Sequence, residues 1–252
     1  MNRKFQNKTV LILGATSGIG RTTALRFAQE GANVVIGGRN EGNGNEVVRS
    51  IEAMDGNGLF VQTDVREPGA LQNAVDRAVE EFGGLNVAFN NAGLAGTGNK
   101  AADESEADWL EMIDTKLNGV WRGMKCQIPA MLEAGGGAIV NMAGNWGLVG
   151  FPTYAAYCAA AHGVMGLTKA AAMEYVGAGI RINAVCPGAV DAPILDRMTG
   201  GNAEIKNSFA QQLPVGRLCS QEDIAEAVLW LASDAASYVN GVGLVLDGGG
   251  SP

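Results

Sequence analysis

Seven short runs of β-branched and apolar residues alternate with longer stretches in which apolar residues recur every three or four positions. The short runs predict buried strands, and the longer stretches predict amphipathic helices. Strands separated by helix-length connections pair in parallel, with helices on both faces of the sheet. The predicted strands are TVLIL (9–13), NVVIG (33–37), GLFVQ (58–62), LNVAFN (85–90), AIVNM (138–142), IRINAV (180–185) and VGLVLDG (242–248).

The alternation continues along the chain without a linker, a low-complexity tract or a repeat of fixed period. We therefore expect residues 1–252 to form a single domain. Its predicted fold is α/β, a Rossmann-type doubly wound parallel sheet flanked by helices on both faces.

Two helical patterns and one weaker segment stand out. The clearest pattern predicts a continuous helix over 109–132, with an apolar stripe that faces the core or another subunit. A second predicted helix, over about 153–177, is rich in Ala and Gly, so other helices or a partner subunit can approach it closely. Over about 192–213 the pattern weakens, which predicts a mobile segment covering the substrate. The stripe consists of Trp109, Ile113, Leu117, Val120, Met124, Ile128 and Met131.

Composition narrows the classes of function. Hydrophobic residues make up 47% of the chain and charged residues 17%, which suits a compact protein with a sizeable core. The net charge of -8 and the lack of a Lys/Arg cluster argue against nucleic-acid binding. The amino terminus MNRKFQNKTV lacks the apolar stretch of a signal peptide, and no window is long enough to span a bilayer. We expect a cytoplasmic protein that does not enter the membrane.

Cysteine and histidine give little support for a metal site. The four cysteines are widely spaced with no CxxC motif, which fits buried thiols in a reducing compartment. His162 is the only histidine, which excludes a multi-histidine metal site and favours a packing role for this residue. We expect no metal.

The first predicted strand runs into the glycine-rich turn GATSGIG, with a helix starting near Ile19. Backbone N–H groups at such a turn and helix start form a site for a pyrophosphate, and glycines let the ligand approach the main chain. The position of the turn, after the first strand of an alternating chain, makes a dinucleotide site the favoured interpretation.

Several motifs in order give the chain a resemblance to the classical short-chain dehydrogenase/reductase family. They are GATSGIG, TDV with Asp64, NNAG (90–93), AVCPGAV (184–190) and the ending GVGLVLDGG. The resemblance implies a Rossmann-type fold, a nicotinamide cofactor and a homotetramer. It implies cofactor contacts at Gly14, Thr16, Ser17, Gly18, Ile19, Gly20, Asp64, Val65, Asn91, Ala92, Gly93, Pro187, Gly188 and Val190.

The end of the second predicted strand bears on the choice of cofactor. NAD-preferring relatives carry an acidic residue at the position of Gly38, where it holds the ribose 2′-hydroxyl. Here Gly38 is followed by Arg39, and an arginine suits a 2′-phosphate. NADP(H) is therefore favoured over NAD(H), although Ser17 is not the basic residue of many NADP(H) relatives and Arg39 can also be read as a solvated loop residue.

The catalytic set departs from the family pattern at three positions. Where relatives have Asn, Ser and Lys beside the tyrosine, this chain has Lys116, Gly144 and Ala161, so only Tyr157 remains. Ala192 also replaces a threonine that contacts the nicotinamide carboxamide in relatives. A phenol without a nearby cation is a poor base at neutral pH, and loss of one donor to a developing oxyanion costs roughly 10²–10³-fold in rate.

Lys116 offers a replacement for the missing cation. It lies on the flank of the apolar stripe, and in the family geometry that flank faces the active site, so its ammonium group would favour the ionised form of Tyr157. The alternative is a lysine that extends to solvent at a subunit boundary. Asn141, Asn145, Trp146 and Cys158 are expected to border the same cleft.

Three functions remain open. The first is an oxidoreductase for an alcohol–carbonyl pair, with a rebuilt site that uses Tyr157 and Lys116. The others are a non-redox catalyst on the same fold (a dehydratase, isomerase or cyclase) and a nucleotide-binding protein without catalysis. The apolar residues of the covering segment favour a mostly apolar small-molecule substrate: Ile194, Leu195, Met198, Ile205 and Phe209.

Overall fold

A parallel sheet of seven strands forms the centre of the computed structural model, which describes residues 3–251. The strand order is β3-β2-β1-β4-β5-β6-β7, and every neighbouring pair is parallel. Each strand coincides with one of the predicted runs, so the predicted fold class is confirmed. The strands are β1 (Thr9–Leu13), β2 (Asn33–Gly38), β3 (Asn57–Gln62), β4 (Val87–Asn90), β5 (Gly137–Met142), β6 (Ile180–Pro187) and β7 (Gly243–Leu246).

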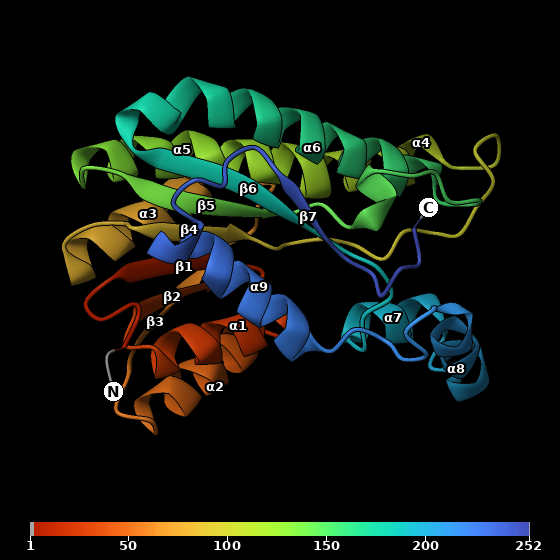
Figure 1. The fold of residues 1–252 in the computed structure, drawn as a ribbon, viewed down its shortest axis with the longest axis horizontal. Helices are drawn as coiled ribbons and strands as arrows, with labels where there is room; N and C mark the ends of the chain where they lie inside the picture. Colours follow the sequence, from red (N-terminus) through yellow and green to blue (C-terminus); the bar gives the residue numbers. More distant parts are fainter. Residues whose placement is uncertain (1–2, 252) are drawn as a thin grey trace.

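Helices cover both faces of the sheet (Figure 1). One face carries α1 (Gly18–Gln29), α2 (Glu41–Glu52) and α9 (Gln221–Ala232). The other face carries α3 (Pro68–Phe82), α5 (Gly119–Glu133) and α6 (Ala155–Tyr175). The shorter α4 (Glu106–Met112), α7 (Pro193–Met198) and α8 (Ala203–Gln212) lie toward the end of the molecule where the strands finish.

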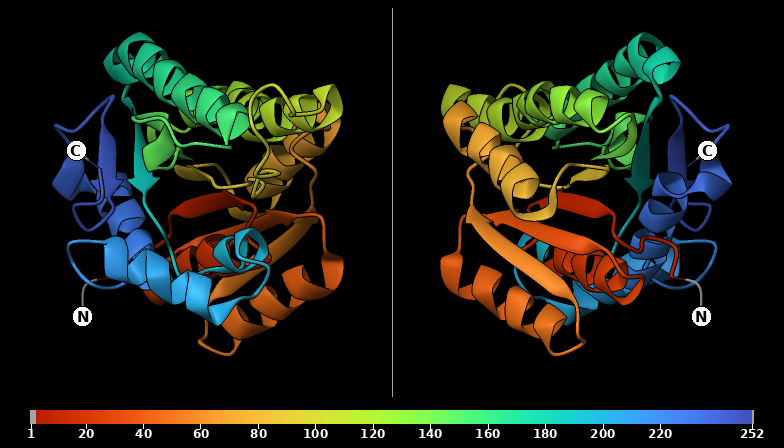
Figure 2. Two further views of the ribbon diagram at one scale, coloured as in Figure 1. Left: turned by 90° about the vertical axis from the view of Figure 1, so that its right-hand side faces the viewer. Right: turned by 90° about the vertical axis from the view of Figure 1, so that its left-hand side faces the viewer.

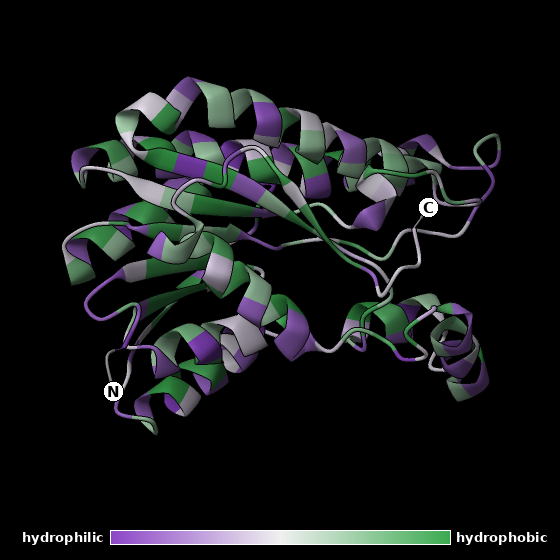
Figure 3. Ribbon diagram, in the orientation of Figure 1, coloured by the Kyte–Doolittle hydropathy of each residue, from purple (hydrophilic) through white to green (hydrophobic). Residues whose placement is uncertain are grey.

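The strand period of two explains why the sheet has a core on each side. Val10 and Ile12 of β1 belong to the core beneath α1 and α9, whereas Leu11 and Leu13 belong to the core beneath α3 and α5. All five residues of β1 are buried. Figure 3 shows the resulting hydrophobic strands between helices that alternate in hydropathy. A strand covered on both faces must be apolar throughout, which is why these runs were recognisable in the sequence.

The continuous helix predicted over 109–132 is interrupted. A π-helical segment, Ile113–Asn118, separates α4 from α5. Because a π turn holds an extra residue, it shifts the buried face relative to a regular helix. Met112, Thr115 and Lys116 are buried, whereas Trp109 of the predicted stripe is 39% exposed. Lys116 therefore lies on the buried face and not on the flank of the stripe, and the exposed Trp109 leaves a subunit contact as the remaining interpretation of that end of the stripe.

The predicted covering segment folds into α7 and α8, which lie together at one end of the molecule (Figure 2). Lys206 of α8 joins them through ion pairs with Asp191 at 2.6 Å and Asp196 at 2.9 Å. The apolar residues expected on the inner side of the covering segment line the cavity described below, except Ile205, which is 45% exposed and lies away from it. Weak periodicity in the sequence thus reflects two short helices, each with little buried surface.

Candidate active site

A cavity of about 1260 Å³ opens at the carboxyl ends of the strands. It includes the point where β1 pairs with β2 on one side and β4 on the other, which is where ligands bind in doubly wound sheets. Almost every residue predicted to form the site lines this cavity. These are Gly14, Thr16, Ser17, Gly18, Ile19, Arg39, Asp64, Val65, Asn91, Ala92, Gly93, Lys116, Tyr157, Pro187, Gly188 and Val190.

The turn after β1 is packed too closely for side chains. Gly14 has φ +80°, and a Cβ added to it would lie 2.8 Å from the backbone N and Cα of Ala92. The Asn91 side chain holds this contact by donating from Nδ2 to the Gly14 carbonyl at 2.9 Å. Gly20 does not line the cavity; its added Cβ would lie 2.2 Å from the Gly14 oxygen, so it allows α1 to pack against the turn.

The start of α1 leaves hydrogen-bond donors available to a ligand. Ser17 is the N-cap residue, is exposed, and makes no side-chain hydrogen bond to the helix. The first N–H groups of a helix have no intrahelical partner and carry partial positive charge. Pro193 of α7 closes over this point, because its Cδ lies 3.2 Å from a Cβ added at Gly18. The turn is a cradle for a phosphate group, covered on one side by α7.

A third region of the cavity lies beyond the ends of β2 and β3. A Cβ added to Gly38 would lie 2.4 Å from Cγ2 of Thr16, so an acidic side chain there would require Thr16 to move. Arg39 is exposed and lines the cavity. Asp64 is paired with Arg66, whose Nη2 donates to Oδ2 at 2.7 Å, and this hydrogen bond holds the pKa of the Asp64 carboxyl below its usual range.

Arg66 was not singled out from the sequence, although its position two residues after Asp64 is the spacing at which an Asp side chain bonds local backbone. The backbone N–H of Arg66 donates to Oδ1 of Asp64 at 3.0 Å. The cavity lining contains four cationic side chains and one carboxylate, Asp64, in a protein with a net charge of -8. Such a positive cavity suits an anionic ligand. The cations are Arg39, Arg66, Lys116 and Arg197.

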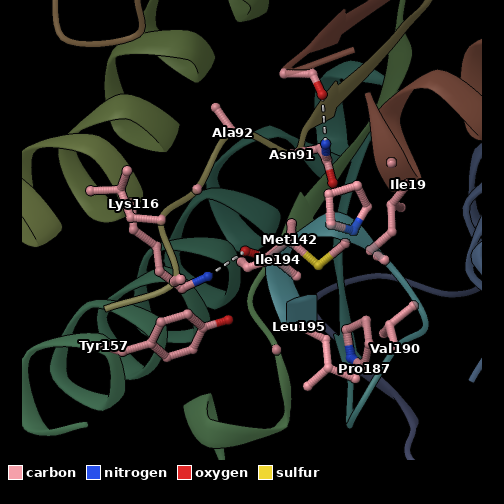
Figure 4. A pocket seen from close by; sticks show the side chains of 18 of the residues that line it. Ile19, Asn91, Ala92, Lys116, Met142, Tyr157, Pro187, Val190, Ile194 and Leu195 are labelled. Atoms are coloured by element: carbon pink, nitrogen blue, oxygen red, sulfur yellow. Dashed lines mark hydrogen bonds between the residues drawn. The ribbon is translucent and has the colours of Figure 1, made fainter. Parts of the chain in front are cut away.

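Lys116 and Tyr157 meet inside the cavity (Figure 4). Lys116 is 2% exposed, and its Nζ lies 4.3 Å from the centroid of the Tyr157 ring. The ammonium group donates to the Met142 carbonyl at 3.4 Å. The lysine therefore points inward, and the alternative of a lysine extending to solvent is excluded for this chain.

The two other altered positions adjoin this pair. Gly144 has φ +85° and ψ 155°, and a Cβ added there would lie 2.9 Å from the Tyr157 hydroxyl oxygen. Ala161 is fully buried and does not line the cavity. The tyrosine hydroxyl thus approaches the backbone at the position where relatives carry a serine side chain.

Aromatic rings form the wall beside Tyr157. Trp146 stacks on Phe151 with centroids 4.2 Å apart and meets Tyr157 edge-on at 5.3 Å. Trp146 and Phe151 line the cavity, as does Asn145. The opposite wall comes from α7, α8 and the residue after them, and the cavity between the two walls is mostly apolar. The apolar residues of the α7–α8 wall are Ile194, Leu195, Met198, Phe209 and Leu213.

Two residues expected at the cleft lie elsewhere. Cys158 does not line the cavity, and the neighbouring His162 is exposed, with Nδ1 2.9 Å from the Cys158 carbonyl. Asn141 is fully buried behind the site, where its Nδ2 donates to Thr168 at 3.0 Å. Residues on a strand or helix near a cleft need not face it, and the sequence does not fix that direction.

Neither a metal centre nor a membrane span is found in residues 3–251. Over this range there is no group of three or more His, Cys, Asp or Glu side chains arranged to hold a metal ion. No helix in the same range is both long and apolar enough to cross a membrane.

The fold and the cavity define an α/β protein with a dinucleotide-sized cavity beside a half-buried tyrosine and a buried lysine. Residues 14–251 match the family model described as enoyl-(acyl carrier protein) reductase. Cyclohexanol dehydrogenase from Acinetobacter sp. (strain SE19) is 45% identical over 249 residues, covering 98% of this chain and 96% of that protein. 2,5-Dichloro-2,5-cyclohexadiene-1,4-diol dehydrogenase from Sphingobium indicum is 39% identical over 253 residues, covering 100% and 99%.

A solved structure gives the same result. The crystal structure of levodione reductase matches with a TM-score of 0.94 at 34% identity, covering 97% of this chain and 98% of that one. The chain belongs to the short-chain dehydrogenase/reductase family. Membership makes it an oxidoreductase that uses a nicotinamide cofactor and acts on an alcohol–carbonyl pair.

Gly14→Ala tests the cradle. The new methyl group would meet the Ala92 backbone at a positive φ, so we expect a loss of roughly 1–3 kcal/mol in the free energy of unfolding. Dinucleotide binding, followed by nicotinamide fluorescence, should also weaken. Gly69→Ala is the matched control, because no atom lies within 4 Å of its added Cβ. If Gly14→Ala melts and binds like Gly69→Ala, the cradle is not the cofactor site.

Proposed function

We propose that this protein is an NADP(H)-preferring dehydrogenase that interconverts a secondary alcohol and a ketone on a mostly apolar six-membered ring, using Tyr157 and Lys116 for the proton. The observation that carries the proposal is the buried Lys116 ammonium group on the Tyr157 ring, 4.3 Å from its centroid. The ring substrate is supported by the cavity walls and by two relatives named for six-membered cyclic alcohols.

The residues of the cavity fit a nicotinamide dinucleotide. The Gly14–Gly20 turn and Ser17 would hold the diphosphate, Asp64 and Val65 would contact the adenine end, and residues 91–93 and 187–190 would line the nicotinamide half. The positive lining and the close packing at Gly14 and Gly38 support this assignment. When bound, the cofactor supplies the acceptor or donor of hydride.

Tyr157 and Lys116 would manage the other half of the reaction. In the direction of oxidation, the phenolate oxygen of Tyr157 takes the hydroxyl proton of the alcohol. Lys116 would place a positive charge beside the oxygens between which the proton moves, and such a charge acts more strongly in a site shielded from water. The Met142 carbonyl holds the ammonium in place. The α7–α8 cover and the Trp146 wall keep water from the reacting atoms.

A preference for NADP(H) rests on the region near Gly38. Gly38 lacks the carboxylate that would hold a ribose 2′-hydroxyl, and adding one there would require Thr16 to move. Arg39 lines the cavity, and its guanidinium group is suited to a phosphate. The exposed hydroxyl of Ser17 supplies a further donor nearby.

The cofactor preference is tested by titrating NADPH and NADH into the parent and into Arg39→Ala. Because Arg39 is exposed, we expect the variant to lose roughly fivefold to tenfold in NADPH affinity, with little change for NADH. Arg49→Ala on α2 is the control, since Arg49 is also exposed but lies outside the cavity lining. Equal affinities of the parent for both cofactors would overturn the preference.

The catalytic pair is tested with cyclohexanol as a first substrate. Tyr157→Phe removes the proton acceptor and should lower kcat by roughly 10²–10⁴-fold. Lys116→Met replaces the buried cation with an apolar side chain of similar length and should lower kcat by about 10²-fold. The double variant should be little worse than either, as expected for groups that act as a unit.

Two controls accompany these variants. Lys169→Met removes an exposed lysine of α6 outside the cavity and should keep the parent rate. The double variant Lys116→Asn/Ala161→Lys places the cation on α6, one helical turn after Tyr157. It should be faster than Lys116→Asn alone. An unchanged rate in Lys116→Met would contradict the proposed pair. Tight cofactor binding with no turnover of any alcohol would favour the non-redox and binding functions.

The proposal includes a homotetramer. α4 and α5 expose large apolar side chains: Leu110 at 56%, Trp121 at 48% and Leu132 at 43%. Light scattering at micromolar concentration should give a mass of about four chains, and Trp121→Glu should lower it, because a charge in an apolar contact is costly. Tyr238→Glu, at a fully exposed site on another face, is the control. A parent of monomeric mass would refute the assembly.

A further inference from the structure

The Lys116 ammonium group has unused hydrogen-bonding capacity. It carries three N–H donors, and the one hydrogen bond it makes, to Met142, is long at 3.4 Å. Among residues 3–251, no carboxylate forms an ion pair with it. A buried ammonium with unmet donors is costly, so a molecule that enters the cavity and offers an acceptor there is strongly favoured.

The position of these donors restricts what can meet them. Figure 4 shows the Lys116 ammonium and the Tyr157 hydroxyl directed into the same part of the cavity. Residue 144 offers no side chain, and the tyrosine hydroxyl already lies against its backbone, so the oxygen that a serine would supply at this position is missing. Two polar groups side by side suit a ligand with two oxygens side by side.

Much of the cavity wall offers no partner to a second oxygen elsewhere on the substrate. The walls around the pair are Trp146 and Phe151 on one side and α7–α8 on the other. Side chains such as Leu195 and Phe209 offer no hydrogen bond to an oxygen on the far side of a ring. A hydroxyl that faces these apolar side chains would lose its water without compensation. Polar lining residues that could meet one away from the pair include Asn145, Arg197 and Gln212.

We propose that the substrate carries a second, neutral oxygen on the carbon next to the reacting one, as in an alicyclic vicinal diol or α-hydroxyketone, and that Lys116 donates to it. This inference rests on the proposed function. The second oxygen is neutral because the walls around the pair are mostly apolar, and a second charge against them would lose its water. One hydroxyl proton passes to Tyr157 and hydride leaves the same carbon for the oxidised cofactor, so that C–OH becomes C=O; the second oxygen is unchanged.

The kinetic test compares kcat/KM for four alcohols: cyclohexane-1,2-diol as separate cis and trans isomers, cyclohexane-1,4-diol, 2-methylcyclohexanol and cyclohexanol. The parent should prefer one 1,2-diol isomer over both the 1,4-diol and the methyl compound by roughly tenfold or more, the effect of one hydrogen bond to a charged group. Lys116→Met should remove this preference in addition to lowering every rate. A parent without the preference, or Lys116→Met that retains it, overturns the inference.

A binding test avoids turnover. Calorimetry on Tyr157→Phe with oxidised cofactor should show the preferred 1,2-diol isomer binding more tightly than 2-methylcyclohexanol, and the added change Lys116→Met should abolish the difference.

If Lys116 instead serves only the cofactor, Lys116→Met will weaken cofactor binding and lower kcat/KM for all alcohols by the same factor. That result overturns this inference and leaves the proposed function intact. A higher kcat/KM for 2-hydroxycyclohexanecarboxylate than for the diol would also overturn the inference, because the ammonium group would then select an anion. Failure of the proposed function is a different result: no cofactor-linked oxidation of any alcohol, or Tyr157→Phe as active as the parent.

Discussion

A buried ammonium group is the constraint on which the candidate site depends. An isolated charge in an apolar interior is unstable, so the surroundings of Lys116 must either stabilise it or receive a ligand that does. The protein supplies one carbonyl, from Met142 at the end of β5, and the face of the Tyr157 ring. Both contacts are weaker than a carboxylate pair. The Lys116 ammonium group is therefore held in place but has no counter-ion in the described part of the protein. Such a group can stabilise negative charge that develops on Tyr157 or on the substrate oxygen.

Two of the altered positions are linked through Tyr157. The π-helical segment turns Lys116 onto the buried face, and the tyrosine hydroxyl lies where a side chain at residue 144 would begin. The backbone at Gly144 has a positive φ, which is unfavourable for any other residue. A serine at this position would therefore strain the loop and displace Tyr157 together. The departure at residue 144 is thus tied to the position of Tyr157, and reversing it alone would conflict with the tyrosine.

The sequence predicted the fold well because the governing signals are local. Strands buried on both faces must be continuously apolar, and the turn after β1 requires glycines at a fixed spacing. The inward direction of Lys116 was anticipated only through the family geometry. The π turn itself was missed, because a sequence period near 3.6 does not reveal where one extra residue enters a helix. The contact of Thr16 with Gly38 depends on the placement of the segments after β1 and at the end of β2, which no local pattern encodes, whereas the pairing of Asp64 with Arg66 is local and its spacing was overlooked.

Behind the site, a buried chain of amide hydrogen bonds explains how a weakly held charge can still be well positioned. Asn90 of β4 donates to Gln127 of α5 at 3.1 Å and to Asn141 of β5 at 2.9 Å, and Asn141 donates to Thr168 of α6 at 3.0 Å. All four side chains are buried, so each bond is shielded from competing water. This hydrogen-bond network links β4 and β5 to α5, which follows the segment that contains Lys116, and to α6, which carries Tyr157. Because Asn141 directly precedes Met142, the same bonds that fix the strand also fix the carbonyl that orients Lys116. The precision of the pair thus comes from the hydrogen-bonded scaffold beneath it, while the freedom to bind a substrate oxygen comes from the donors that this scaffold leaves unused.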